Sequence, residues 1–131
     1  MKFFIFLILS SLQIGLKAQA HLGVSLNDLK IMYPNKYFNV SFSDDGTKYI
    51  TTQMPLGSFS YYFNSQTGLT ESCIQIPNNL TDLNTQVEIY NKKYVIVSEI
   101  AWKAYLEGGG MMKILLKYNE EYKLYAFHYW N

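Results

Sequence analysis

The residues best suited to nucleophilic or acid–base chemistry are few in this chain. It contains two histidines, His21 and His128, and a single cysteine, Cys73. Nucleophilic catalysis needs a general base beside the nucleophile, and the G-x-S-x-G turn that presents a catalytic serine is absent. The apolar neighbours of Cys73 favour a thiol buried in a strand, with an intermolecular bridge as the alternative. The sequence therefore indicates no nucleophilic catalyst.

Carboxylates are the other groups that could support hydrolysis, because a pair of them suffices for cleavage of a glycoside. Candidate carboxylates are Glu71, Glu99, Glu107, Glu120 and Glu121. The last two are adjacent in a polar segment, where solvated charge is the default. The Gly108–Gly110 run lacks the Lys-Ser/Thr pair and the helix start of a phosphate-binding loop. We therefore predict a non-catalytic protein without a cofactor.

The first twenty residues have the pattern of an export signal. Lys2 supplies a positive start, Phe3–Leu9 is an apolar core, and Ala18-Gln19-Ala20 matches the A-x-A cleavage site. The core is too short for a membrane anchor, which needs about 20 apolar residues. No cysteine lies near the cleavage site, which disfavours a lipoprotein. We expect a cleaved signal peptide, residues 1–20, and one exported domain, residues 21–131, in the periplasm or outside the cell.

Cleavage after Ala20 would make His21 the N-terminal residue. An α-amine together with an imidazole chelates Cu(II), and a second imidazole, for which His128 is the candidate, would complete the site. The alternative is an accidental N-terminal histidine and an ordinary sheet histidine near Trp130. The sequence favours the alternative, because it places no carboxylate near the two histidines.

The charge balance argues against several classes of partner. The chain has 11 basic and 10 acidic residues, and every basic residue is a lysine. Loss of Lys2 and Lys17 with the signal would leave nine lysines and ten acidic residues, with no basic run. Nucleic acids and anionic membranes are therefore poor partners. Bidentate recognition of phosphate or carboxylate also lacks its usual residue, arginine.

Aromatic residues are the clearest indication of a binding surface. The chain has 12 tyrosines and two tryptophans. These side chains offer a large contact area with a polar group, so a sheet face that carries them suits a protein partner or stacking on sugars. Alternatively, tyrosine merely replaces phenylalanine and leucine on a half-solvated sheet. The candidate binding residues are Tyr61, Trp102, Tyr125, Tyr129 and Trp130.

The C-terminal stretch predicts a β-hairpin. Two runs rich in β-branched and aromatic residues, Met112–Tyr118 and Tyr122–Trp130, flank the polar triplet Asn119-Glu120-Glu121. Such a hairpin is marginal alone, so the rest of the chain must supply further strands or a helix against it.

Two more hairpins are expected earlier in the chain. Tyr37–Ser43 and Lys48–Met54 are separated by Asp44-Asp45-Gly46-Thr47, and Asp-Gly between apolar runs is a strong hairpin signal. The EF-hand spacing is absent, so these aspartates are expected to be solvated turn residues. Phe59–Asn64 and Leu69–Ile76 form the next pair, and Pro77 ends it.

Two helices are predicted, and each follows a capping residue. Ser25 and Asp28 form a variant capping box for a helix over Leu26–Met32, with Leu26, Leu29, Met32 and Tyr33 as its buried stripe. Pro34 ends this helix. The second helix covers Asn78–Lys93, with Asn79 or Thr81 as the cap and Leu80, Leu83, Val87 and Tyr90 as the apolar stripe.

The segment Tyr94–Leu106 combines two patterns. Its start is strand-like, whereas Glu99–Leu106 contains good helix formers. We favour a strand, with a short helix as the alternative. Gly108–Gly110 then turns the chain into the C-terminal hairpin.

Together these elements predict an α+β fold in which two helices pack on one face of an antiparallel sheet of about six or seven strands. Leu26-Asn27-Asp28-Leu29 echoes Leu80-Thr81-Asp82-Leu83, which suggests a duplicated helix-plus-meander.

The G-x-S-x-x-D-L opening at Gly23–Leu29, followed by antiparallel strands in a small exported chain, resembles the β-lactamase-inhibitor-protein-like domains. The chain is also similar to small exported proteins of Bacteroidetes-type bacteria, including the signal that ends in Ala-Gln-Ala. The resemblance implies a domain that binds proteins or assists envelope assembly, and it carries no contact residues with it. We expect a non-catalytic binding protein of inhibitor, immunity or assembly type. The alternative is a module that binds a small ligand or Cu(II).

Overall fold

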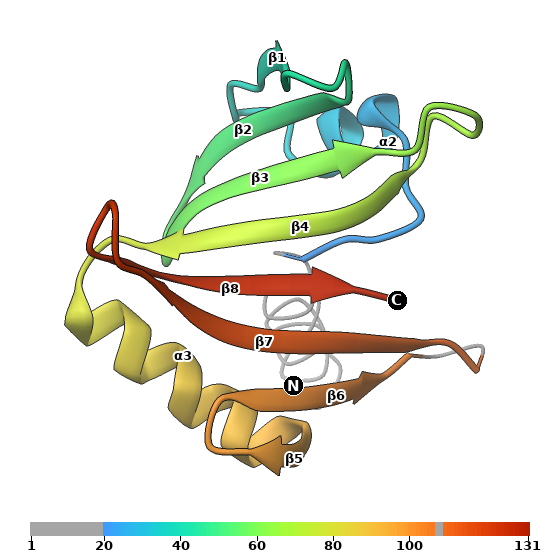
Figure 1. Cartoon of the computed structure of the whole chain (residues 1–131). Helices are drawn as coiled ribbons and strands as arrows, with labels where there is room; N and C mark the ends of the chain where they lie inside the picture. Colours follow the sequence, from blue (N-terminus) through green and yellow to red (C-terminus); the bar gives the residue numbers. More distant parts are fainter. Residues whose placement is uncertain (1–19, 107–108) are drawn as a thin grey trace, which may run out of the picture.

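The chain runs twice through one helix followed by a set of antiparallel strands (Figure 1). The computed structural model describes residues 20–106 and 109–131. The expected export signal lies outside these described residues, except for Ala20. The first unit consists of α2 (Leu26–Met32), β1 (Asn39–Phe42), β2 (Lys48–Met54), β3 (Gly57–Phe63) and β4 (Thr70–Pro77). The second consists of α3 (Leu80–Lys93), β5 (Val95–Ser98), β6 (Ala101–Tyr105), β7 (Met111–Asn119) and β8 (Leu124–Trp130).

All the strands of the described residues belong to one eight-stranded antiparallel sheet with the order β1-β2-β3-β4-β8-β7-β6-β5. The last strands of the two units, β4 and β8, pair at its centre, with Cys73 opposite Tyr129 and Gln75 opposite Phe127. The predicted α+β class and antiparallel sheet are confirmed. The order of elements is also the predicted one, a helix followed by a meander in each half of the chain.

The predicted number of strands was too low, because Tyr94–Leu106 forms two strands instead of one. The chain turns at Glu99-Ile100, where the Ile100 N–H donates to the Ser98 hydroxyl over 3.3 Å. The β-branched run Val95-Ile96-Val97 suits the first of these strands. The alternative helix over Glu99–Leu106 is not formed, since β6 pairs with β5 on one side and with β7 on the other.

The first helix has the predicted bounds and the predicted cap. The Ser25 hydroxyl accepts a hydrogen bond from the Asp28 N–H (3.0 Å), and the Asp28 carboxylate accepts one from the Ser25 N–H (3.2 Å). Its buried stripe is narrower than predicted: Leu29 is fully buried, whereas Met32 is 40% exposed. The second helix begins at Leu80 with Asn79 as its cap, and Leu80 is exposed instead of buried.

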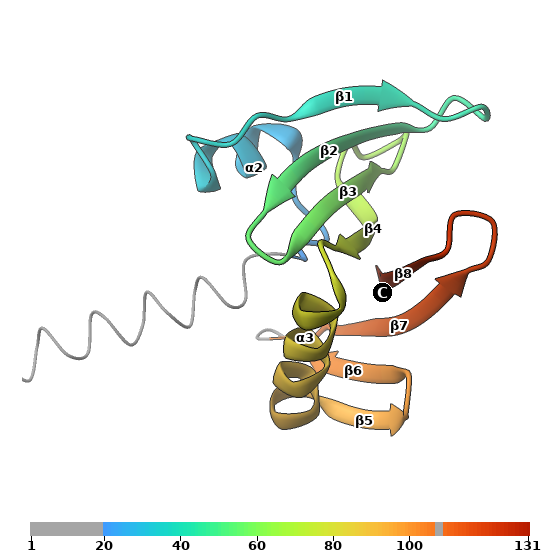
Figure 2. The same cartoon turned by 90° about the vertical axis from the view of Figure 1, so that its left-hand side faces the viewer.

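Both helices pack on the same face of the sheet, as predicted (Figure 2). The core on that face joins Leu29 of α2 and Leu83 and Tyr90 of α3 to alternate strand residues such as Ile50 and Phe127. The intervening strand residues point to the other side, which no described helix covers. We call this side the helix-free face. Figure 2 also shows that the β1–β2 and β7–β8 turns project on the side away from the helices.

A closed set of buried hydrogen bonds fixes α3 on the central strands. The Gln86 amide donates to the hydroxyls of Tyr90 (2.5 Å) and Tyr129 (3.1 Å). The Tyr129 hydroxyl donates to Gln75 Oε1 (2.7 Å) and lies 2.5 Å from the Tyr90 hydroxyl. The Gln75 amide donates to Gln86 Oε1 and to the Leu56 carbonyl. All four side chains of this glutamine–tyrosine cluster are buried, and each polar hydrogen has an acceptor.

Replacement of Tyr129 by phenylalanine should destabilise the fold markedly. The change removes one hydroxyl. Gln75 Oε1 then loses its donor from Tyr129, and one N–H of the Gln86 amide loses its acceptor. A buried polar atom without a partner costs about 1–3 kcal/mol. We expect Tyr129→Phe to lower the free energy of unfolding by that amount in urea denaturation followed by circular dichroism. The matched control is Tyr125→Phe in the same strand, because Tyr125 is 41% exposed and should change stability by less than about 0.5 kcal/mol. Equal effects of the two substitutions would contradict the role given to the cluster.

Candidate functional site

Three of the five predicted binding residues lie in the core and cannot contact a partner from there. Tyr61, Trp102 and Tyr129 are 0–1% exposed. Trp102 donates its indole N–H to the Asn91 side chain over 2.8 Å, and Tyr129 belongs to the glutamine–tyrosine cluster. The expectation that these three rings face a partner is therefore wrong. The polar groups of Trp102 and Tyr129 hold α3 on the sheet, and Tyr61 is part of the same hydrophobic core.

The other two predicted binding residues are accessible but do not share a surface. Tyr125 lies near the β7–β8 turn, beside Tyr118 at a ring distance of 4.8 Å, and it alternates onto the helix side of β8. Trp130 is half-buried and faces the opposite side, because it lies three positions after Phe127 in the same strand. Only Trp130 lies on the helix-free face.

The two histidines of the predicted copper site do not converge. The His21 ring lies against Tyr33 of the helix-covered side, with its Nε2 3.2 Å from the Tyr33 hydroxyl. His128 faces the helix-free side between Ile74 and Leu115 of the neighbouring strands. The sheet separates them, so a site that uses both imidazoles is not formed. Within residues 20–106 and 109–131, no group of three or more His, Cys, Asp or Glu side chains is arranged to hold a metal ion.

The helix-free face carries two adjoining hollows over β3, β4, β7 and β8. One has a volume of about 500 Å³ and is bordered by Tyr62 and Trp130. The other has a volume of about 300 Å³ and extends toward Tyr122 at the β7–β8 turn. Three side chains border both hollows: Ile74, Lys117 and His128. The hollows therefore form one continuous groove along the central strands, which we call the central groove.

Aromatic stacking stiffens one end of the central groove. Tyr62 of β3 stacks on Tyr49 of β2, with ring centres 5.1 Å apart. Burial, and to a smaller extent Tyr49, raise the pKa of the Tyr62 hydroxyl, so it is neutral at pH 7. A stacked aromatic pair is a rigid contact surface that loses little conformational entropy when a partner binds.

The floor of the groove is electrostatically simple. His128 is half-buried, and burial together with the nearby Lys117 ammonium lowers its pKa below the usual 6.5. The imidazole is therefore neutral at pH 7, and its strand neighbours are apolar. By alternation along their strands, the side chains of Lys103, Lys113 and Lys117 point to the helix-free face. Acidic residues lie in the turns instead: Asp44, Asp45, Glu99, Glu120 and Glu121. A neutral imidazole among apolar side chains and lysines suits contact better than proton transfer.

Sequence reasoning found Trp130 and His128 but missed Tyr62, Ile74 and Lys117. Alternation indicates that Tyr61 and Tyr62 point to opposite sides, yet it does not tell which side the helices cover. The predicted C-terminal hairpin could have indicated part of the groove, because Lys117, His128 and Trp130 lie in its two strands.

Cys73 is buried, as predicted. It lies in β4, and burial raises the pKa of its thiol well above the usual value, so the thiol stays protonated and unreactive in the folded protein.

Comparisons with family models, with curated proteins and with solved structures found no match to this chain. In the described part of the chain, no helix is long and apolar enough to cross a membrane.

The titration of His128 tests the geometry of the groove floor. We expect a pKa below 6.5 by NMR titration, and Lys117→Gln should move it back toward 6.5 because a nearby positive charge is removed. Since the folded-state pKa is the lower one, the unfolded chain binds more protons below pH 6.5. Stability should therefore fall as the pH drops below 6.5. Replacement of Lys113, which does not border the groove, serves as the control. If the pKa of His128 is the same in the Lys117→Gln variant, the placement of the two side chains next to each other is contradicted.

Proposed function

We propose that this chain is an exported, non-catalytic binding protein that recognises another envelope or extracellular protein through the helix-free face of its sheet. The observation that carries the proposal is the central groove. It is an aromatic and apolar hollow on a face that no described helix covers, and it joins the strands of both helix–meander units.

The composition of the groove supports a protein partner. Tyrosine and tryptophan are enriched among residues that dominate binding energy at protein interfaces. Here Tyr62 and Trp130 border one end, Tyr122 lies toward the other, and Ile74 lies between them. Lys117 and His128 border both hollows beside Ile74, so the groove offers a partner polar groups together with apolar contact, and protein interfaces combine the two.

The resemblance to β-lactamase-inhibitor-protein-like domains supports the same proposal. The repeated helix-plus-meander agrees with the duplication suggested by the sequence, and domains of that group bind proteins or assist envelope assembly. An inhibitor or immunity protein that faces a secreted enzyme or toxin fits this size and the expected export. An assembly role fits equally well.

The arrangement of titratable groups also favours binding over catalysis. His128 has apolar strand neighbours, Cys73 is a protonated buried thiol, and the turn carboxylates are spread over three different turns. A catalytic mechanism would need a nucleophile, a base and an orienting group within hydrogen-bond reach of one another.

Loss of the groove aromatics should abolish partner capture. The exported protein would be immobilised and exposed to the envelope and medium fractions of its host, and bound proteins identified by mass spectrometry. We expect one stoichiometric partner, and Trp130→Ala and Tyr62→Ala should each weaken its binding at least about tenfold, as expected for central interface residues.

The control for this experiment is Phe42→Ala, which removes an exposed aromatic ring on the helix side of β1. It should leave capture unchanged, and circular dichroism should show that all three variants are folded. Capture that depends on Phe42 and not on Tyr62 or Trp130 would overturn the choice of face. A folded protein that captures no partner would overturn the proposed function.

A further inference from the structure

Two lysine side chains on the helix-free face lie directly opposite each other. Lys103 of β6 pairs with Lys113 of β7 in the register of the sheet. Lys113 in turn lies opposite Trp130 of β8, and Lys103 lies opposite Val95 of β5. Residues directly opposite in neighbouring strands share a face, so these four side chains form one line across the sheet. We call this line the lysine row.

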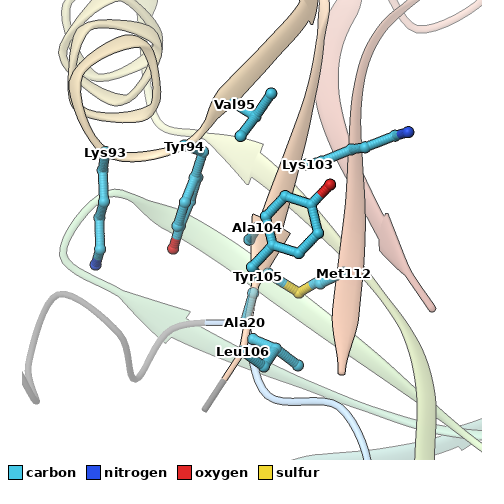
Figure 3. Close-up of a pocket in the computed structure, with 9 residues that line it drawn as sticks. All are labelled: Ala20, Lys93, Tyr94, Val95, Lys103, Ala104, Tyr105, Leu106 and Met112. Carbon is cyan, nitrogen blue, oxygen red and sulfur yellow. The ribbon is translucent and has the colours of Figure 1, made fainter. Parts of the chain in front are cut away.

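The direction of the Lys103 side chain agrees with this placement. Figure 3 shows it pointing away from the end of α3, where Lys93 and Tyr94 lie on the helix-covered side. The residues before and after it in β6, Trp102 and Ala104, are buried in the core on the helix side. The Lys103 ammonium therefore reaches the helix-free face.

The sheet itself gives the two lysines no compensating charge. Like charges directly opposite each other in a sheet are destabilising. The neighbours of the pair along the row, Trp130 and Val95, carry no charge. Within the described strands the one acidic residue is Glu71, whose carboxylate accepts a hydrogen bond from the Asn64 amide beside β4, two strands away from Lys113. An anionic group from outside the chain would relieve the repulsion.

The surroundings of the lysine row strengthen its attraction for such a group. Lys103, Lys113 and Trp130 are half-buried, and Val95 is 50% exposed. Lysine stems that lie along apolar surface keep their ammonium groups at the surface. An ion pair at a partly buried site is screened less by salt than one in open solvent, so a carboxylate binds more firmly there.

The length of the row and two acidic turns limit the kind of anion that fits. Neighbouring strands lie about 4.8 Å apart, so the row spans about 14 Å, the length of about four extended residues. Figure 2 shows that the β1–β2 and β7–β8 turns project on the helix-free side, and they carry Asp44-Asp45 and Glu120-Glu121. A long polyanion such as a nucleic acid would also meet these carboxylates. A short acidic segment can lie on the lysine row and avoid them.

We propose that the protein partner of the helix-free face carries a short acidic segment, whose carboxylates lie over Lys103 and Lys113 beside the Trp130 ring. This inference rests on the function proposed above, and it adds the charge of the partner and the place where that charge binds. The lysine row continues the central groove, because Trp130 borders the groove as well. One partner therefore covers both.

Titration of the exported protein with short peptides tests the proposal directly. An acetylated hexaglutamate peptide is the acidic probe, and acetylated hexaglutamine is its uncharged control. Since Trp102 is 1% exposed, a change in tryptophan fluorescence reports on Trp130, and Trp130→Phe should remove the signal. We expect hexaglutamate to bind with a dissociation constant of about 1 mM or lower at low ionic strength, and hexaglutamine not to bind. Binding should weaken as salt is added.

Neutral substitutions of the two lysines show whether the row carries this binding. Lys103→Gln and Lys113→Gln should each weaken hexaglutamate binding about three- to fivefold, as expected for a partly solvated ion pair. The control Lys92→Gln makes the same change in net charge in the last turn of α3 and should leave binding unchanged. The proposal is overturned if hexaglutamate does not bind, if Lys92→Gln is as harmful as the other two, or if hexagalacturonate, a sugar chain of the same charge, binds more tightly than the peptide.

The repulsion within the row gives a second test that needs no ligand. Lys113→Gln removes one of the two opposed charges, so it should raise the midpoint of thermal unfolding by about 1–4 °C at low ionic strength. The gain should vanish in high salt, and Lys92→Gln should show none. A lower midpoint for Lys113→Gln at low ionic strength would contradict an uncompensated pair.

The capture experiment separates this inference from the proposed function. A captured partner that depends on Tyr62 and Trp130 but binds the Lys103→Gln and Lys113→Gln variants unchanged overturns the acidic segment and leaves the binding function in place. If no partner is captured, the proposed function fails, and the hexaglutamate titration still decides whether the lysine row binds a chain of carboxylates.

Discussion

The hydrogen bonds of the glutamine–tyrosine cluster constrain the rest of this structure. Gln75 comes from β4, Gln86 and Tyr90 from α3, and Tyr129 from β8, so the cluster ties one helix to the two strands at the junction of the halves. All of its hydrogen bonds can form together only in one orientation of α3 about its own axis and in one register of β4 against β8. A slip of one residue would turn Gln75 to the other face and leave the buried amides and hydroxyls unpaired.

The surfaces available for function follow from this constraint. Because α3 is fixed on one side, the residues that alternate with Gln75 and Tyr129 form the helix-free face. Ile74, His128 and Trp130 lie there for this reason, and they border the central groove. One buried network therefore sets the location of the central groove.

Features that depend on neighbouring residues could be predicted from the sequence, whereas those that depend on sheet order could not. The capping box of Ser25 and Asp28 and the C-terminal hairpin need only local spacing, and the prediction of each is confirmed. The turn at Glu99-Ile100 lacks glycine and proline, so the division of Tyr94–Leu106 into two strands gave no local signal. The copper hypothesis for His21 and His128 required both residues on one side of the sheet, which only the long-range order of strands decides.

Tyr61 and Tyr62 show the same difference between what the local sequence predicts and what the arrangement of the sheet decides. Tyr61 and Tyr62 have the same chemistry and adjacent positions, yet Tyr61 is fully buried and Tyr62 borders the central groove. Composition alone could support either a binding surface or a core in which tyrosine replaces phenylalanine. The structure places Tyr61 in the core and Tyr62 on the helix-free face, because a strand with helices on one side gives alternate residues different environments. The aromatic residues thus divide between the core and the surface position by position along each strand, and a partner would have access only to the rings that remain exposed.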